Sequence, residues 1–248
     1  MSVYVTGDTH GGFQRLGMKY FPEQKKMNRE DMVIIAGDFG GLWGGTPAEK
    51  YWLDWLEDKP FTTAFLDGNH ENFAMLNALP ERLWHGGRIH EVRPHVLHLM
   101  RGQVFDIEGY TFFTMGGASS HDIQDGILDP EEPGFEERYW RMRRARAMFR
   151  VKGVSWWEQE MPNEDEYTEA VRTLEYVNYK VDYIISHCAP TSIQQKLNPD
   201  FTPDMLTDFL EKIKQRADYY YWLFGHYHDN KVVDEKHILL WEQIVKLF

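Results

Sequence analysis

The chain has 248 residues, of which 42% are hydrophobic, so it can bury the core of one large α/β domain. Its formal net charge of −12 argues against general nucleic-acid binding through a basic surface. The single cysteine, Cys188, excludes an intrachain disulfide, and no apolar stretch approaches the roughly 20 residues of a membrane span. We therefore expect a single domain over residues 1–248, located in the cytoplasm and without a membrane anchor.

The first third of the chain alternates apolar runs with helical or loop stretches, as βαβ units do. Residues 3–5, 32–36 and 62–66 are predicted strands, buried on both faces. Residues 47–58 carry tryptophan and leucine side chains on a helical period and are a predicted helix. From 88 to 117 the pattern changes to short extended runs, including a predicted hairpin of 104–107 and 110–115 around Glu108-Gly109. This region indicates a second, more antiparallel sheet or edge.

The second half continues the α/β alternation. Residues 165–179 form a predicted helix that Asn163 caps, with Glu166 three residues on, and the strand at 183–186 follows. Thr202-Pro203 is expected to open a further helix that runs to about Arg216. A strand at 219–224 and a closing hairpin of 231–233 with 237–241 complete the α/β prediction.

Metal-ligating side chains follow five of the predicted strands. They lie in Gly7-Asp8-Thr9-His10, Gly37-Asp38, Gly68-Asn69-His70-Glu71, His187 and Gly225-His226-Tyr227-His228. Because ligand sites in α/β sheets gather beyond the carboxyl ends of the strands, we expect these clusters to meet. The seven candidate donors are the oxygens of Asp8, Asp38 and Asn69 and the imidazoles of His10, His187, His226 and His228.

Seven donors are too many for one tetrahedral zinc ion, so the pattern predicts two divalent metal ions. Mixed oxygen and imidazole donors suit manganese, which we expect first, and also iron, zinc or nickel. One carboxylate must then bridge the ions, and Asp38 is the natural candidate because it stands between the other donors in chain order. Two ions bridged in this way lie about 3.5–4 Å apart in hydrolytic centres.

The same ordered set of clusters resembles the calcineurin-like metallophosphoesterase superfamily over nearly the whole chain. The resemblance implies a layered α/β/β/α sandwich, in which helices flank two mixed sheets. It also implies two ligand sets, which are Asp8, His10, Asp38 and His228 for one metal and Asp38, Asn69, His187 and His226 for the other. His70 would remain free of metal and protonate the leaving oxygen, while a hydroxide that bridges the two ions attacks phosphorus.

The expected activity is hydrolysis of a phosphoester, with a phosphomonoester or nucleotide as the main substrate class. A phosphodiesterase or nuclease that acts on cyclic nucleotides or nucleic-acid ends is the alternative. Protein phosphatases of this superfamily carry two phosphate-binding arginines where Gly41-Leu42-Trp43 and Asp67 stand here, so a protein phosphatase is disfavoured. A non-catalytic metal-binding scaffold is the third hypothesis, but such a protein would be expected to lose metal ligands or His70.

Residues 119–160 are predicted to form an insertion or lid. Within it, 138–150 is the one basic segment of the chain, with aromatic residues between its arginines. One interpretation is a solvated helix that pairs with the acidic residues beside it. The other is that the arginines bind phosphates and the aromatic rings stack on a base. The remaining histidines lack a strand before them, although His121-Asp122 is a weak candidate to approach the site.

Overall fold

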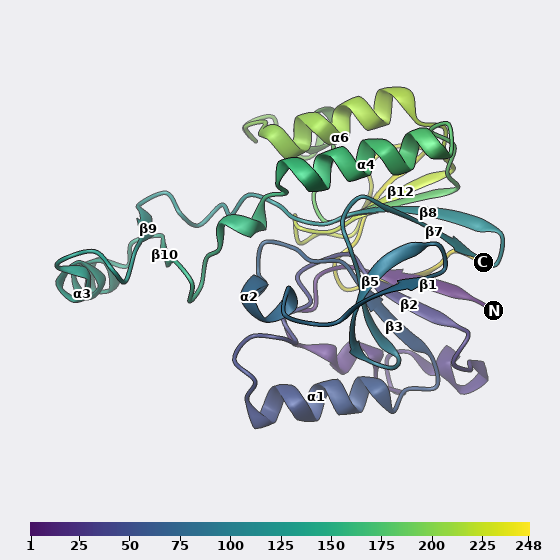
Figure 1. Cartoon of the computed structure of the whole chain (residues 1–248), viewed down its shortest axis with the longest axis horizontal. Helices are drawn as coiled ribbons and strands as arrows, with labels where there is room; N and C mark the ends of the chain where they lie inside the picture. The colour runs from purple at the N-terminus through teal and green to yellow at the C-terminus, as the bar shows by residue number, and fades with distance from the viewer.

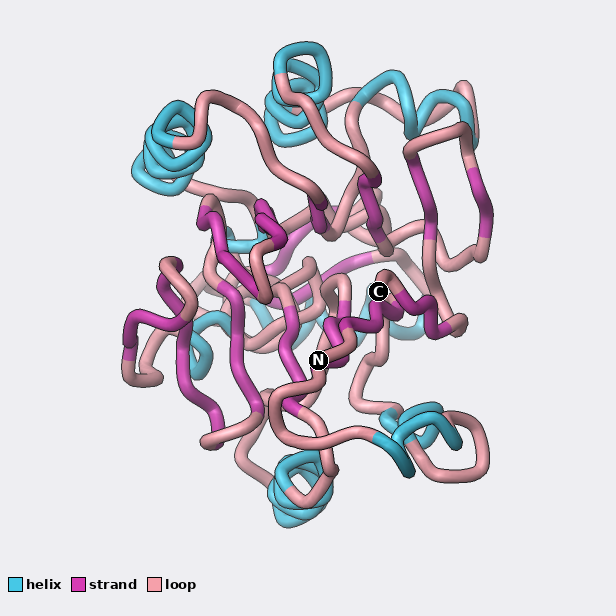
Figure 2. The backbone as a smooth tube through the Cα atoms, turned by 90° about the vertical axis from the view of Figure 1, so that its right-hand side faces the viewer, coloured by secondary structure: helices cyan, strands magenta, loops and turns pink.

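The structure is a computed structural model that describes residues 1–248, and it has two large sheets face to face between two groups of helices (Figures 1 and 2). In Figure 1, α1 (Pro47–Glu57) lies below the lower sheet, whereas α4 (Glu164–Tyr176) and α6 (Met205–Arg216) lie above the upper one. The two chain ends lie close together on the face seen in Figure 2. The predicted layered α/β/β/α sandwich is confirmed.

The lower sheet has seven strands in the order β15-β1-β2-β3-β6-β5-β4. Their bounds are β1 (Val3–Thr6), β2 (Met32–Ile35), β3 (Thr62–Phe65), β4 (Glu81–Trp84), β5 (Gly87–Arg93), β6 (Val96–Leu99) and β15 (Ile244–Lys246). The four central strands β1, β2, β3 and β6 are parallel. The outer strands β15, β5 and β4 are antiparallel to their neighbours, so the sheet is mixed.

The upper sheet has six strands in the order β13-β14-β12-β11-β8-β7. Their bounds are β7 (Gln103–Ile107), β8 (Tyr110–Met115), β11 (Tyr183–Ser186), β12 (Tyr221–Phe224), β13 (Lys231–Val232) and β14 (His237–Leu239). Here β8, β11, β12 and β14 are parallel. The predicted hairpin around Glu108-Gly109 is confirmed as β7 and β8.

Side chains alternate between the two faces of each buried strand, and this alternation produces three apolar layers. Val5 and Ile34 of the lower sheet meet Ile185 and Leu223 of the upper sheet in the layer between the sheets. The opposite face of the lower sheet packs on α1, and that of the upper sheet packs on α4 and α6. Because both sheets are covered on both faces, their strand ends are held rigidly.

Residues 121–156, named the arm from here on, extend away from the layers on the left of Figure 1. The arm contains the short parallel strands β9 (Gly126–Leu128) and β10 (Phe149–Val151) and the helix α3 (Phe135–Ala145) between them. The basic segment is therefore divided between a helix and a strand rather than forming one helix. The other short elements are η1 (Phe13–Leu16), η2 (Pro22–Lys26), α2 (Phe73–Leu76), η3 (Glu158–Glu160) and α5 (Thr191–Leu197).

Several helices and strands begin or end at other residues than predicted, and local hydrogen bonds account for the differences. The helix expected from Thr202-Pro203 begins only at Met205, because the Asp204 side chain caps it by accepting from the backbone of Thr207. The α4 helix has the predicted capping box of Asn163 and Glu166, but it ends at Tyr176. The closing hairpin is shorter than expected, and β15, which was not predicted, pairs with β1. The extended runs after 88 are shared between both sheets.

Candidate metal centre

The first donor group joins the two ends of the chain. Asp8 and His10 follow β1, Asp38 follows β2, and His228 follows β12. One ligand atom from each of these four residues lies within 4.8 Å of those of the other three. His228 Nε2 is 3.1 Å from both Asp8 Oδ2 and His10 Nε2, and His10 Nε2 is 3.7 Å from Asp38 Oδ2. The four residues predicted for one metal are therefore brought together.

A second group of donors lies on the other side of Asp38. His187, which follows β11, places its Nε2 3.4 Å from Asp38 Oδ1 and 3.3 Å from Asn69 Oδ1. The other ring nitrogen, Nδ1, is 2.9 Å from the Ala36 carbonyl oxygen, to which it donates. In the neutral ring with its proton on Nδ1, Nε2 carries the lone pair that a metal ligand needs, and it faces two oxygens that are also acceptors. Three lone-pair donors that converge in this way fit a cation.

His226 completes the predicted second set only in part. Its ring centroid is 5.0 Å from that of His187, but its Nε2 lies 2.8 Å from Nε2 of His121. His121 thus reaches the edge of the centre. The sequence alone made His121 only a weak candidate for this position. The sequence signal for His121 is its position after β8 and the Gly116-Gly117 turn. Because β8 is a parallel neighbour of β11, the residues that follow the two strands lie at the same edge of the sheet.

The loops that carry the donors have a strained backbone at several positions, and at Gly68 a donor side chain lies close against the backbone. His10, Asp38, His226 and His228 adopt left-handed φ values of 46°, 46°, 70° and 48°, which side chains other than glycine rarely adopt. A Cβ at Gly68 would collide with the Asp38 carboxylate, so only glycine permits this approach. Such strain persists where the surroundings fix the donors in place.

Both carboxylates of the centre are buried. Asp8 and Asp38 are each 1% exposed. Burial and the neighbouring Asp8 charge raise the pKa of Asp38. Burial also acts to raise the pKa of Asp8, but the hydrogen bonds from His228 and His226 and the charge of His187 together lower it. Two adjacent buried carboxylates are costly unless positive charge compensates them. The donor chemistry of the centre therefore fits divalent cations.

Asn69 is oriented from behind by a buried pair. Its Nδ2 donates to Ser120 Oγ at 3.3 Å, and the Ser120 hydroxyl donates to the buried carboxylate of Glu160 at 2.6 Å. The Ser120 backbone N–H also donates to Glu160, at 3.0 Å. This chain of hydrogen bonds turns Asn69 Oδ1 toward His187. An aspartate at position 69 has no N–H to donate to Ser120, which gives a physical reason for the amide.

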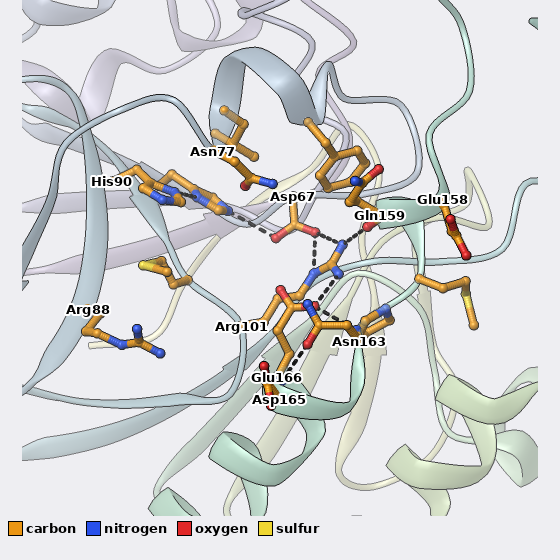
Figure 3. A pocket seen from close by; sticks show the side chains of 16 residues that line it. Asp67, Asn77, Arg88, His90, Arg101, Glu158, Gln159, Asn163, Asp165 and Glu166 are labelled. Atoms are coloured by element: carbon orange, nitrogen blue, oxygen red, sulfur yellow. Dashed lines mark hydrogen bonds and ion pairs between the residues drawn. The ribbon is translucent and has the colours of Figure 1, made fainter. Parts of the chain in front are cut away.

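A second buried network supports the turn that carries Asn69. Arg101 lies between Asp67 and Glu166 in Figure 3, and its Nε donates to Asp67 Oδ2 at 2.8 Å. His98 Nε2 is 3.0 Å from the other oxygen of Asp67. Although burial opposes it, the charge of Arg101 lowers the pKa of Asp67. These groups border a cavity of about 540 Å³, but every one of them already has a protein partner.

His70 lies beside the first donor group and does not join it. Its backbone N–H donates to Asp38 Oδ1 at 2.8 Å, and its ring centroid is 5.2 Å from that of His10. The Nη2 atom of Arg150, from the arm, lies 3.3 Å from His70 Nδ1, and Arg150 also pairs with Asp122. Burial and the charge of Arg150 lower the pKa of His70 to about 4. Its ring is therefore neutral at pH 7 in the free protein.

A family model described as calcineurin-like phosphoesterase matches residues 1–230. The chain therefore belongs to the calcineurin-like phosphoesterase family and is a metal-dependent phosphoester hydrolase. Comparison with curated proteins finds no match. None of its helices combines the length and the apolar character needed to cross a membrane.

Proposed function

We propose that the protein hydrolyses phosphomonoesters, nucleotides among them, at a pair of divalent metal ions. The observation that carries the proposal is the orientation of the Asp38 carboxylate. Its Oδ2 faces His10 at 3.7 Å, whereas its Oδ1 faces His187 at 3.4 Å. One carboxylate is thus shared between two donor groups, as a bridging ligand must be.

In this proposal the two ligand sets are those that the family resemblance implies, and manganese is the expected metal. Asp8, His10, Asp38 and His228 would hold one ion, and Asp38, Asn69, His187 and His226 would hold the other. Bound divalent ions supply positive charge that polarises the phosphoryl oxygens and lowers the pKa of water. Asp38 would fix the position of one ligand set relative to the other. The Ala36 carbonyl holds His187 in the tautomer that a metal ligand needs.

His70 is the proposed proton donor to the leaving oxygen. Its ring lies next to the first donor group without joining it. The approach of a phosphate dianion raises the pKa of a nearby imidazole, which opposes the effect of Arg150. The positive charge of Arg150 beside His70 also suits a monoester, because a monoester carries one more negative charge than a diester.

The proposal is tested by comparing p-nitrophenyl phosphate with bis(p-nitrophenyl) phosphate, each with added Mn²⁺. We expect kcat/KM to be higher for the monoester. A clear preference for the diester would instead favour the phosphodiesterase or nuclease alternative. Family membership leaves the scaffold hypothesis without support, and the cytoplasmic location stays a prediction.

A further inference from the structure

The arm contains a cavity of about 670 Å³ outside the donor groups. We name it the arm pocket and define it by Phe135, Tyr139, Arg143, Arg146, Phe149 and Arg150. Its volume lies within the roughly 300–1,000 Å³ of small-molecule sites. Three arginines and three aromatic rings line it together with Asp122, whose carboxylate pairs with Arg150. The two remaining arginines and the rings match a ligand that is both anionic and aromatic.

Two of the three arginines of the arm pocket, Arg143 and Arg146, have no acidic partner. Among the arginines of the arm, only Arg138 and Arg150 pair with carboxylates, those of Glu132 and Asp122. Arg143 contacts the hydroxyl and the ring of Tyr139, and Arg146 makes no ion pair. The interpretation of this segment as a helix paired with its acidic neighbours therefore does not explain Arg143 and Arg146.

Arg146 also occupies a backbone position that favours glycine. It follows the last residue of α3 with a φ of 55°, in the left-handed region. A side chain other than glycine is disfavoured there, so an arginine has a backbone cost that glycine would not have. An arginine that the fold disfavours and that lines a cavity points to a role in binding.

The arm pocket adjoins the metal centre through His70. The ring of His70 lies 5.2 Å from that of His10 between centroids, and its Nδ1 lies 3.3 Å from Arg150 Nη2. If His70 protonates the leaving oxygen, the leaving group must lie on the His70 side of the scissile phosphate. It then extends past Arg150 and into the arm pocket.

We propose that the arm pocket binds the leaving group of the substrate, and that this group carries an aromatic base and a second phosphate, as in a nucleoside bisphosphate. The inference rests on the proposed function, because it uses the direction in which His70 places the leaving group. Arg143 and Arg146 hold the second phosphate, and the rings of Tyr139 and Phe149 stack on the base.

Two double variants with the same change of charge test the proposal. The pocket variant is Arg143→Ala with Arg146→Gly, and the control variant is Arg141→Ala with Arg144→Ala on the same helix. Arg141 and Arg144 do not line the arm pocket. Arg146→Gly places glycine where the backbone favours it, so the melting temperature of the pocket variant should not fall because of that change.

The substrates are adenosine 3′,5′-bisphosphate and p-nitrophenyl phosphate, each with Mn²⁺. In the pocket variant we expect KM for the bisphosphate to rise at least about tenfold, the loss expected when a charged contact to phosphate is removed. KM for p-nitrophenyl phosphate should stay within about twofold of wild type, because that leaving group has no second phosphate. An unchanged KM for the bisphosphate, or an equal rise in the control variant, would overturn the proposal.

A binding measurement separates this inference from the proposed function. Adenosine 3′,5′-bisphosphate is titrated calorimetrically into EDTA-treated protein, so neither turnover nor the metal ions contribute to the heat. Binding at least tenfold weaker in the pocket variant than in the control variant supports the arm pocket, even if no monoester is hydrolysed. Equal binding by both variants counts against it, as does pocket dependence seen only with a phosphorylated oligonucleotide.

Discussion

The metal centre and the arm lie next to each other, and they are built differently. Asp8, Asp38 and His187 are at most 1% exposed and sit at the ends of fully buried strands. The helix α3 has no buried residue at all, and the strands beside it are three residues long. The comparison teaches that this protein fixes its donors with the packed layers and leaves the contacts with the leaving group to a lightly packed extension.

The strongest test of the rigid region removes its shared carboxylate. We expect Asp38→Ala to lower turnover about 10³-fold or more, because both donor groups lose a ligand and positive charge at the phosphoryl group is lost. Metal content measured by elemental analysis should fall for both ions, whereas Asp8→Ala should affect mainly one. Full metal occupancy in Asp38→Ala would contradict the bridging role.

The boundary between the two regions is tested at His70. His70→Ala should lower kcat by about 10²–10⁴-fold, the usual contribution of a general acid. Both ions should remain bound, because the ring of His70 belongs to neither donor group. His85→Ala, at an exposed position outside both donor groups, serves as the control. Loss of metal in His70→Ala would show that His70 is itself a ligand.

A smaller effect, on metal affinity, is expected from the hydrogen bond between Asn69 and Ser120. Ser120→Ala removes the acceptor that orients the Asn69 amide, so metal affinity should fall about 10–100-fold. Titration of metal-free protein with Mn²⁺ measures this affinity. Ser119→Ala, one residue earlier and without a hydrogen bond to Asn69, is the matched control. Identical affinities in the two variants would mean that Ser120 does not position Asn69.

The smallest effect should come from the exposed face of the arm. Phe65, in β3, is fully buried and stacks on Phe39, so Phe65→Ala should lower the free energy of unfolding by about 3–5 kcal/mol. Trp140, on α3, is 55% exposed, and Trp140→Ala should change the free energy of unfolding by less than about 0.5 kcal/mol. Chemical denaturation measures both. A large loss in Trp140→Ala would mean that the arm packs more tightly than its exposure indicates.

The sequence was most informative where apolar runs end in polar clusters. The runs before Asp8, Asp38, Asn69 and His187 are long enough to identify buried strands, and the rule for parallel sheets brings their ends together. It was less informative at short elements. The three-residue strand β15 has no periodic signal of its own and exists because it pairs with β1. The start of α6 depended on whether Asp204 or Thr202 capped the helix, and both residue types are good caps.

Contacts that depend on tertiary placement could not be read from the pattern. The hydrogen bonds from Asn69 through Ser120 to Glu160 join residues 51 and 40 positions apart, and neither Ser120 nor Glu160 belongs to a motif. The same holds for Arg150, which reaches His70 over 80 residues. The basic segment stands out by its composition, but only the fold shows that Arg150 contacts His70 whereas Arg143 and Arg146 do not.

The distance along the chain between His10 and His228 has a consequence for biosynthesis. These two donors are 218 residues apart, yet their Nε2 atoms lie 3.1 Å from each other. Until residue 228 has been made, Asp8, His10 and Asp38 lack the imidazole that completes their group. With the ligand set proposed above, an ion can be held by all four residues only after His228 has been made, so metal loading follows the synthesis of β1 to β12.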